Sequence, residues 1–118
     1  MTPTNSAIDA LTRLRDAPFP MWIFDIQTLA FLEVNDAAIR MYGYSRQQFL
    51  AMTILDIRPI EDIPALLRRE WKERQHSTNG EVWQHLKRDG TVIAVEITSF
   101  ESEFNGRGVE IVIVREIH

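Results

Sequence analysis

The sequence predicts an α+β domain in which a five-stranded antiparallel sheet carries short helices on one face, with a flanking helix at the N-terminus. Three observations lead to this fold class. The chain has 118 residues, 45% of them hydrophobic and 25% charged, which is typical of one globular domain. Two strand-like stretches precede a helical middle, and three follow it. Between the last three, Asp89-Gly90 and Asn105-Gly106 favour turns with positive φ, which join antiparallel strands.

The first element is expected to be an amphipathic helix over about residues 5–16. Its apolar stripe is built around Ile8, Leu11 and Leu14. Two interpretations of this stripe remain open. It packs on the helix's own domain, or it also forms the contact of a homodimer with a second copy of the chain. The stripe is too short for an autonomous coiled coil.

Two prolines within residues 18–20 end this helix, because the residue before a proline is pushed toward extended geometry. We therefore expect residues 1–17 to form the flanking helix and residues 18–118 the main domain. The first two strands are expected over Met21–Ile26 and Ala30–Val34, joined by a turn.

The stretch after the second strand carries the strongest local signals in the chain. Asn35 or Asp36 caps a short helix over Ala37–Tyr42, because a short side-chain oxygen accepts an otherwise unpaired backbone N–H. Gly43 is expected to end this helix in the left-handed conformation.

A second short helix is expected to begin after Ser45, with Gln48 completing a capping box. Leu55–Pro59 shows no helical period and is interpreted as a connector. Glu61–Gln75 is predicted to be the longest helix, with its proline tolerated in the first turn.

The last three strands are expected over Glu81–Lys87, Thr91–Phe100 and Val109–Ile117. Apolar residues occupy both alternation phases of these strands, so both faces of the sheet are expected to be covered. The short helices would cover one face and the N-terminal helix part of the other.

Composition excludes several classes of function. The net charge is −4 and no basic stripe is present, so a nucleic-acid partner is not expected. The chain has no cysteine, which removes disulfides, thiolate metal sites and any cysteinyl adduct with a chromophore, and is typical of a reducing, cytoplasmic compartment. No apolar run approaches the roughly 20 residues of a membrane span and no signal peptide opens the sequence, so we expect a soluble chain without a membrane partner.

Catalytic and metal-binding constellations are not recognisable in the sequence. The three histidines are His76, His85 and His118, and no residues combine a nucleophile, a base and oxyanion donors. His76 and His85 are too far apart for one helix face, and no carboxylate is an obvious third metal ligand. We therefore expect a protein that is not an enzyme and holds no metal.

A ligand site between sheet and helices is the main functional hypothesis, because a sheet that curls over short helices encloses an apolar interior. From the strands, the expected lining is Trp22, Phe24, Trp83, His85, Val95, Ile97, Ile111 and Ile113. From the helices, it is Ala38, Met41, Leu55, Leu66 and Leu67. Core packing is the alternative for every one of these residues. His85 and Arg115 share the apolar phase, and each needs a partner or solvent because an unpaired buried polar group is costly.

Three motifs resemble the PAS-domain family of sensory modules. The first is Val34-Asn35-x-Ala37, followed by Tyr42-Gly43-Tyr44-Ser45 and Gln48-Phe49. The second is His85-Leu86-Lys87-Arg88-Asp89-Gly90-Thr91, ending in Val95-Glu96, and the third is the terminal Val114-Arg115-Glu116-Ile117. Their order and spacing cover nearly the whole chain from about Arg15 onward. The resemblance implies a PAS-like fold.

The resemblance also limits which cofactors the chain is expected to bind. The flavin-binding light sensors of this family carry an Asn-Cys-Arg-Phe-Leu motif, in whose place this chain has Met52-Thr53-Ile54-Leu55-Asp56. A flavin adduct is therefore excluded by the lack of cysteine, and so is the coumarate chromophore. Haem-binding members use a histidine near the long helix, where His76 lies. His76 stands among polar residues at a helix end, however, which makes haem the less favoured reading.

The resemblance implies a non-catalytic sensor of bacterial-type signalling. Such a module binds a small organic ligand and relays the change to a covalently linked effector, which is a histidine kinase, a cyclic-di-nucleotide enzyme or a DNA-binding regulator. The rival hypothesis is a structural dimerisation module whose interior is filled by its own side chains.

Overall fold

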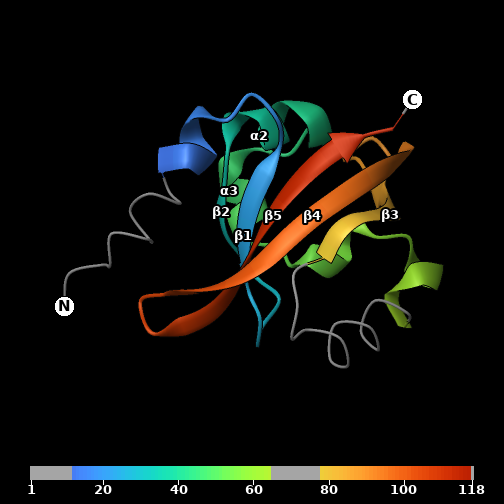
Figure 1. Cartoon of the computed structure of the whole chain (residues 1–118). Helices are drawn as coiled ribbons and strands as arrows, with labels where there is room; N and C mark the ends of the chain where they lie inside the picture. The colour runs from blue at the N-terminus through green and yellow to red at the C-terminus, as the bar shows by residue number, and fades with distance from the viewer. Residues whose placement is uncertain (1–11, 65–77, 118) are drawn as a thin grey trace.

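The structure is a computed structural model, and it describes residues 12–64 and 78–117. Within these ranges, five strands form one antiparallel sheet in the order β2-β1-β5-β4-β3, which confirms the predicted α+β fold (Figure 1). The strands are β1 (Met21–Asp25), β2 (Phe31–Val34), β3 (Thr78–Leu86), β4 (Val92–Phe104) and β5 (Arg107–Glu116). β3, β4 and β5 are longer than expected at the ends where their residues become polar.

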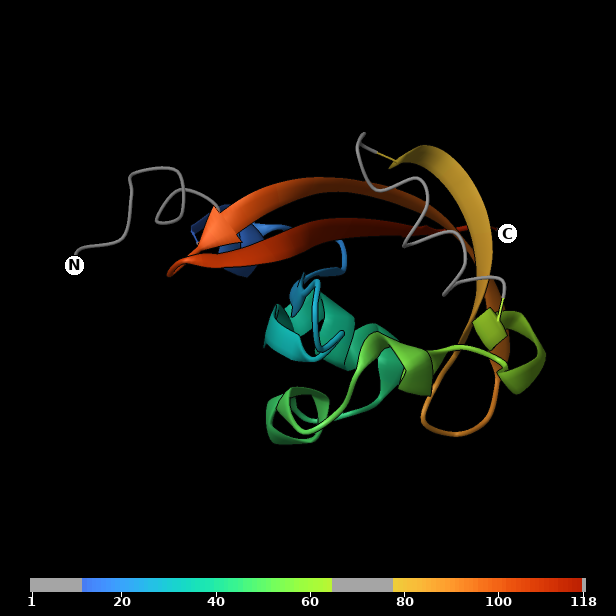
Figure 2. The same ribbon diagram turned by 90° about the horizontal axis from the view of Figure 1, so that it is seen from below.

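The helices of the middle segment lie together on one face of the sheet, which arches over them (Figure 2). They are α2 (Asp36–Tyr42), α3 (Arg46–Leu50) and the 3-10 helices η1 (Ile54–Ile57) and η2 (Ile60–Asp62). Residues 12–16 are also helical, as expected for the end of the flanking helix. Most of the predicted long helix after Asp62, including Leu66 and Leu67, lies outside the described residues, as does His76.

Asn35 fixes the junction between β2 and α2. Its Oδ1 accepts the N–H of Ala38, which makes it the helix cap, and also the N–H of Met21 at the start of β1. Its Nδ2 donates to the carbonyl of Phe19. One buried side chain therefore links the start of β1, the end of β2 and the start of α2. Of the two capping residues that the sequence allowed, Asn35 and Asp36, the structure uses Asn35.

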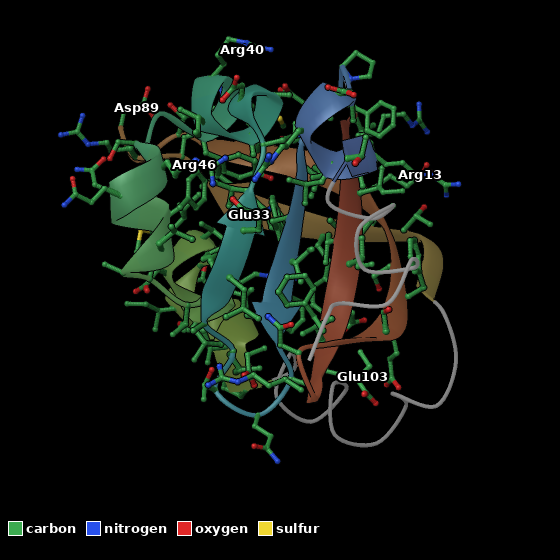
Figure 3. The ribbon with its side chains drawn as sticks, turned by 90° about the vertical axis from the view of Figure 1, so that its left-hand side faces the viewer. Arg13, Glu33, Arg40, Arg46, Asp89 and Glu103 are labelled. Atoms are coloured by element: carbon green, nitrogen blue, oxygen red, sulfur yellow. The ribbon has the colours of Figure 1, made fainter. Side chains whose placement is uncertain are left out.

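The α3 helix begins as predicted. The Ser45 hydroxyl accepts the N–H of Gln48, and the Gln48 side chain accepts the N–H of Ser45, which completes the capping box. Arg46 then pairs with Glu33 of β2, which is one of the two edge strands of the sheet, and the two side chains point toward one another (Figure 3). This ion pair links the helix to the sheet edge.

The expectation of a connector without helical structure at Leu55–Pro59 was wrong in part, because its first residues belong to the 3-10 helix η1. Thr53 and Asp56 form a second capping box, in which Asp56 accepts the N–H of Thr53 and the Thr53 hydroxyl accepts the N–H of Leu55. This helix is too short to show an apolar period, and its signal was the spacing of its capping residues.

Replacing Gly43 by valine is expected to destabilise the protein by about 1–2 kcal/mol. Gly43 ends α2 at φ +88°, a left-handed conformation that strains a β-branched residue, and an added Cβ would lie 3.4 Å from the Cβ of Arg88. The measurement is chemical denaturation. Gly108→Val is the matched control, because Gly108 has no positive φ and its added Cβ meets only ordinary contact with Ile26. An equal loss in both variants would contradict the explanation.

Two cores cover the two faces of the sheet. The inner core, between sheet and helices, is formed by Trp22, Phe24, Leu29, Phe31, Val34, Ala38, Tyr42, Phe49, Ile54, Ile57, Ile93, Val95, Ile97, Val112 and Val114. The outer core consists of Leu14, Met21, Ile23, Val109 and Ile111, with Ile113 and Leu32 packed against it.

The predicted phase of β5 was wrong. Ile111 and Ile113 belong to the outer core, and Val112 and Val114 face the helices instead. The pairing with β1 sets this phase, because Trp22 stands directly opposite Val112 and side chains of paired residues share a face. The β5 sequence is apolar in both phases, so its alternation could not decide.

Leu14 is fully buried by its own chain, against Met21, Ile23, Val109 and Ile111. The expectation that the N-terminal helix covers part of the second face is therefore correct for this residue. The other two residues proposed for a dimer contact, Ile8 and Leu11, lie outside the described residues.

Candidate functional site

The predicted ligand-binding residues that the structure describes meet on the inner face, apart from the two isoleucines of β5. Trp22, Phe24, Ala38, Val95 and Ile97 are buried members of the inner core. Met41, Leu55 and Trp83 are half-buried against it. His85 is fully buried beside Trp22. The phases of β1, β3 and β4 were thus predicted correctly.

Trp22 lies at the centre of an aromatic cluster in this core. Its ring centroid lies 5.5 Å from that of Phe31, 5.6 Å from that of Tyr42 and 5.8 Å from that of His85. The first two contacts are edge-to-face, an arrangement that the ring quadrupole favours. Phe49 continues the cluster with edge contacts to Phe31 and Tyr42.

Tyr42 was missed by the sequence analysis as a site residue. It ends α2 one turn after Ala38, and that i, i+4 spacing was the signal that could have placed both on the same helix face. Its hydroxyl oxygen lies 2.6 Å from Nδ1 of His85, which comes from β3, 43 residues later in the chain. The two side chains join the helix layer to the sheet.

Both members of this pair are held in their neutral forms. Burial lowers the pKa of His85 well below its ordinary value, and the positive charge of Arg58 lowers it further. Burial raises the pKa of Tyr42, an effect that Arg58 opposes and Glu116 reinforces. A neutral imidazole therefore faces a neutral phenol, and the contact is a short neutral hydrogen bond.

Two polar atoms in this cluster have no hydrogen-bond partner among the described residues. They are Nε1 of Trp22 and Nε2 of His85. Each belongs to a side chain that is almost completely buried. Leaving such a group unpaired costs roughly 1–3 kcal/mol, so these atoms mark the place where a ligand group would be most readily accepted.

Arg58 is the second residue beside this cluster that the sequence analysis did not include in the candidate site. It follows η1, is only 8% exposed, and its guanidinium lies 4.4 Å above the ring of Trp83. A cation over an aromatic face is favourable, and more so when water is excluded. The signal for Arg58 was its position in an otherwise apolar segment between Ile57 and Pro59.

Arg115 does not belong to this site. It is exposed on the opposite face and donates to Glu96 of β4, with Nη2 to Oε1 at 3.0 Å. Arg115 thus meets its need for solvent and a partner at the surface, with its side chain 70% exposed.

In residues 12–64 and 78–117, no cluster of three or more His, Cys, Asp or Glu side chains could hold a metal ion. None of the helices in those ranges is long and apolar enough to span a bilayer.

Comparison with known proteins places this geometry in context. A family model described as PAS fold matches residues 9–116. A PAS domain from a two-component sensor histidine kinase is 27% identical, with a TM-score of 0.76 over 93% of this chain and 94% of that one. The PAS domain of an HTR-like protein from Haloarcula marismortui is 17% identical, with a TM-score of 0.77 over 95% and 92%. A LOV protein from Rhodobacter sphaeroides is 9% identical, with a TM-score of 0.77 over 97% and 68%. These last two likenesses concern the fold alone. No curated protein matches the chain.

Proposed function

Because this chain belongs to the PAS fold family, we propose that it is a non-catalytic sensory module that binds a small organic ligand between sheet and helices. In this proposal residues 18–118 form the sensor and residues 1–17 its flanking helix. The resemblance to a PAS domain from a two-component sensor histidine kinase supports a covalently linked kinase as the effector.

The observation that carries this proposal is the pair of unpartnered nitrogens in the inner core. A core that served only for packing would be expected to satisfy its polar atoms or to use apolar residues in their place. Here Trp22 and His85 bury two ring nitrogens within one aromatic cluster. A ligand with complementary polar atoms would remove that cost.

The same cluster supplies a route for the signal. Trp22 stands opposite Val112 on β5, and β5 runs on through Val114 to Glu116 near the end of the chain. A ligand that displaces the Trp22 ring would press on the inner face of β5. It biases the output only if it binds one arrangement of these elements better than the other.

A second candidate function is a structural dimerisation module, and the aromatic packing favours it. Trp22, Phe31, Tyr42 and Phe49 are all nearly or fully buried and fill the inner core with edge contacts. In that case the wild-type chain is expected to sediment as a dimer at micromolar concentration with no bound molecule. Ile8→Asp combined with Leu11→Asp would then give a folded monomer.

The experiment that separates the two is native mass spectrometry of freshly purified protein, with an absorbance scan for flavin or haem. A sensor is expected to show an added mass that disappears on denaturation. The added mass should be reduced in Trp22→Phe, which keeps a large ring and loses the indole nitrogen. A protein of bare sequence mass after gentle purification, together with a dimer that Ile8→Asp and Leu11→Asp dissociate, would support the structural module instead.

A further inference from the structure

The unpartnered atoms of the inner core are hydrogen-bond donors. Trp22 Nε1 carries a hydrogen and can only donate. The tautomer of His85 follows from Tyr42. If His85 Nδ1 donated to the Tyr42 oxygen, the hydroxyl hydrogen of Tyr42 and the lone pair of His85 Nε2 would both be buried without a partner among the described residues, whereas donation by the Tyr42 hydroxyl leaves only the Nε2 N–H unpaired. The Tyr42 hydroxyl therefore donates to Nδ1, which leaves the ring proton of His85 on Nε2.

Arg58 brings a positive charge close to these donors. Trp83 and His85 lie two residues apart on the same face of β3, and the Arg58 guanidinium lies 4.4 Å above the Trp83 ring. The charge of Arg58 lowers the pKa of His85, and no acidic side chain opposes that effect in the described part of the chain. At Tyr42 the effect of Arg58 is larger than that of Glu116, the acid that opposes it. Donors and a cation thus converge on one region of the core.

The geometry points to a small organic carboxylate as the ligand, whose oxygens accept from Trp22 Nε1 and His85 Nε2 while Arg58 compensates the negative charge. Its apolar body would pack among the aromatic rings of the inner core. Bonds from neutral or cationic donors to a carboxylate are stronger than bonds between neutral groups, whereas an amine would meet donors and a like charge. This inference rests on the proposed function, because it names the ligand of the same site.

Three probes of one shape and different charge test the inference: benzoate, benzyl alcohol and benzylamine. Binding is measured by intrinsic tryptophan fluorescence and by the indole N–H signals in ¹H–¹⁵N spectra, where loss of one signal in Trp22→Phe assigns Trp22. Benzoate is expected to bind saturably, about tenfold more tightly than benzyl alcohol, and to shift the Trp22 signal. Benzylamine is expected to bind more weakly than both.

Matched variants of the protein distinguish the contribution of the ligand's charge to binding from that of its shape. Trp22→Phe and Arg58→Met are each expected to weaken benzoate about tenfold and to leave benzyl alcohol nearly unchanged. Arg115→Met removes an exposed arginine from the opposite face and should leave benzoate binding unaltered. Thermal melts verify that each variant is folded; if Arg58→Met is not, Arg58→Lys keeps the charge and should retain the preference for benzoate over benzylamine.

Two kinds of failure are distinguishable. If benzyl alcohol binds as tightly as benzoate, or if a molecule that co-purifies lacks an acidic oxygen, the carboxylate inference is wrong while ligand sensing stands. If no probe binds saturably and mass spectrometry finds no bound molecule, the proposed function fails and the inference fails with it.

Discussion

Replacing Trp22 by alanine is expected to lower the free energy of unfolding by about 3–5 kcal/mol, the largest effect of any single substitution considered for this protein. Trp22 is 2% exposed and its ring lies against Phe31, Tyr42 and His85. Its removal would lose the transfer free energy of a large apolar side chain and leave a cavity that the rigid rings around it could not fill. Urea denaturation of both proteins, with comparison of midpoint and slope, measures the loss.

Phe19→Ala is the control for this substitution. Phe19 is 42% exposed and lies just before β1, so its truncation is expected to cost less than about 1 kcal/mol. If Trp22→Ala fails to fold, Trp22→Phe keeps the inner core largely filled and is expected to cost about 1–2 kcal/mol. A loss from Trp22→Ala no greater than that of Phe19→Ala would mean that Trp22 does not lie at the centre of the core.

The elements that the sequence predicted well are those with short-range signals. Gly43 ends its helix, Ser45 and Gln48 form their box, and Asn105-Gly106 forms its turn with both residues at positive φ, all as expected. Each of these outcomes depends on residues within one turn of each other, so local propensity and tertiary structure agree.

The face of the sheet on which each β5 residue lies could not be predicted from the local sequence. Val112 and Val114 are as apolar as Ile111 and Ile113, and a slip of one residue in register exchanges the two faces. Only the pairing of β5 with β1, some 90 residues earlier in the sequence, decides which pair faces the helices, through Trp22 opposite Val112.

Only part of the candidate site could be predicted, because its residues come from several elements that are distant in the sequence. His85 was found because it shares an alternation phase with Trp83 on β3. Its partner Tyr42 ends α2, and the neighbouring cation Arg58 directly follows η1. No periodicity within a single element relates residues that meet only when separate elements pack.

Stability is expected to fall as the pH is lowered from 6.5 toward 4.5 because of His85. The ordinary pKa is 6.5, and burial beside Arg58 lowers the pKa of the folded protein well below that value. Below pH 6.5 the unfolded chain therefore binds a proton that the folded chain excludes. The stabilisation is fully present above pH 6.5 and is lost as the pH falls toward the lowered pKa, with a slope approaching 1.4 kcal/mol per pH unit. Denaturation curves at half-unit intervals of pH measure the slope.

His85→Gln isolates this contribution. Glutamine does not titrate, and its side-chain oxygen offers an acceptor in place of the His85 nitrogen for the Tyr42 hydroxyl. The variant is expected to be less stable at pH 7.5 and to have a nearly flat profile down to pH 4.5, while the remaining histidines, His76 and His118, are unchanged. Asp89, whose pKa is lowered by its hydrogen bonds to Thr91, acts below this window, because its ordinary pKa is 3.8. A slope that survives in His85→Gln would assign the acid sensitivity to other groups and would remove the evidence that a neutral His85 is buried in the inner core.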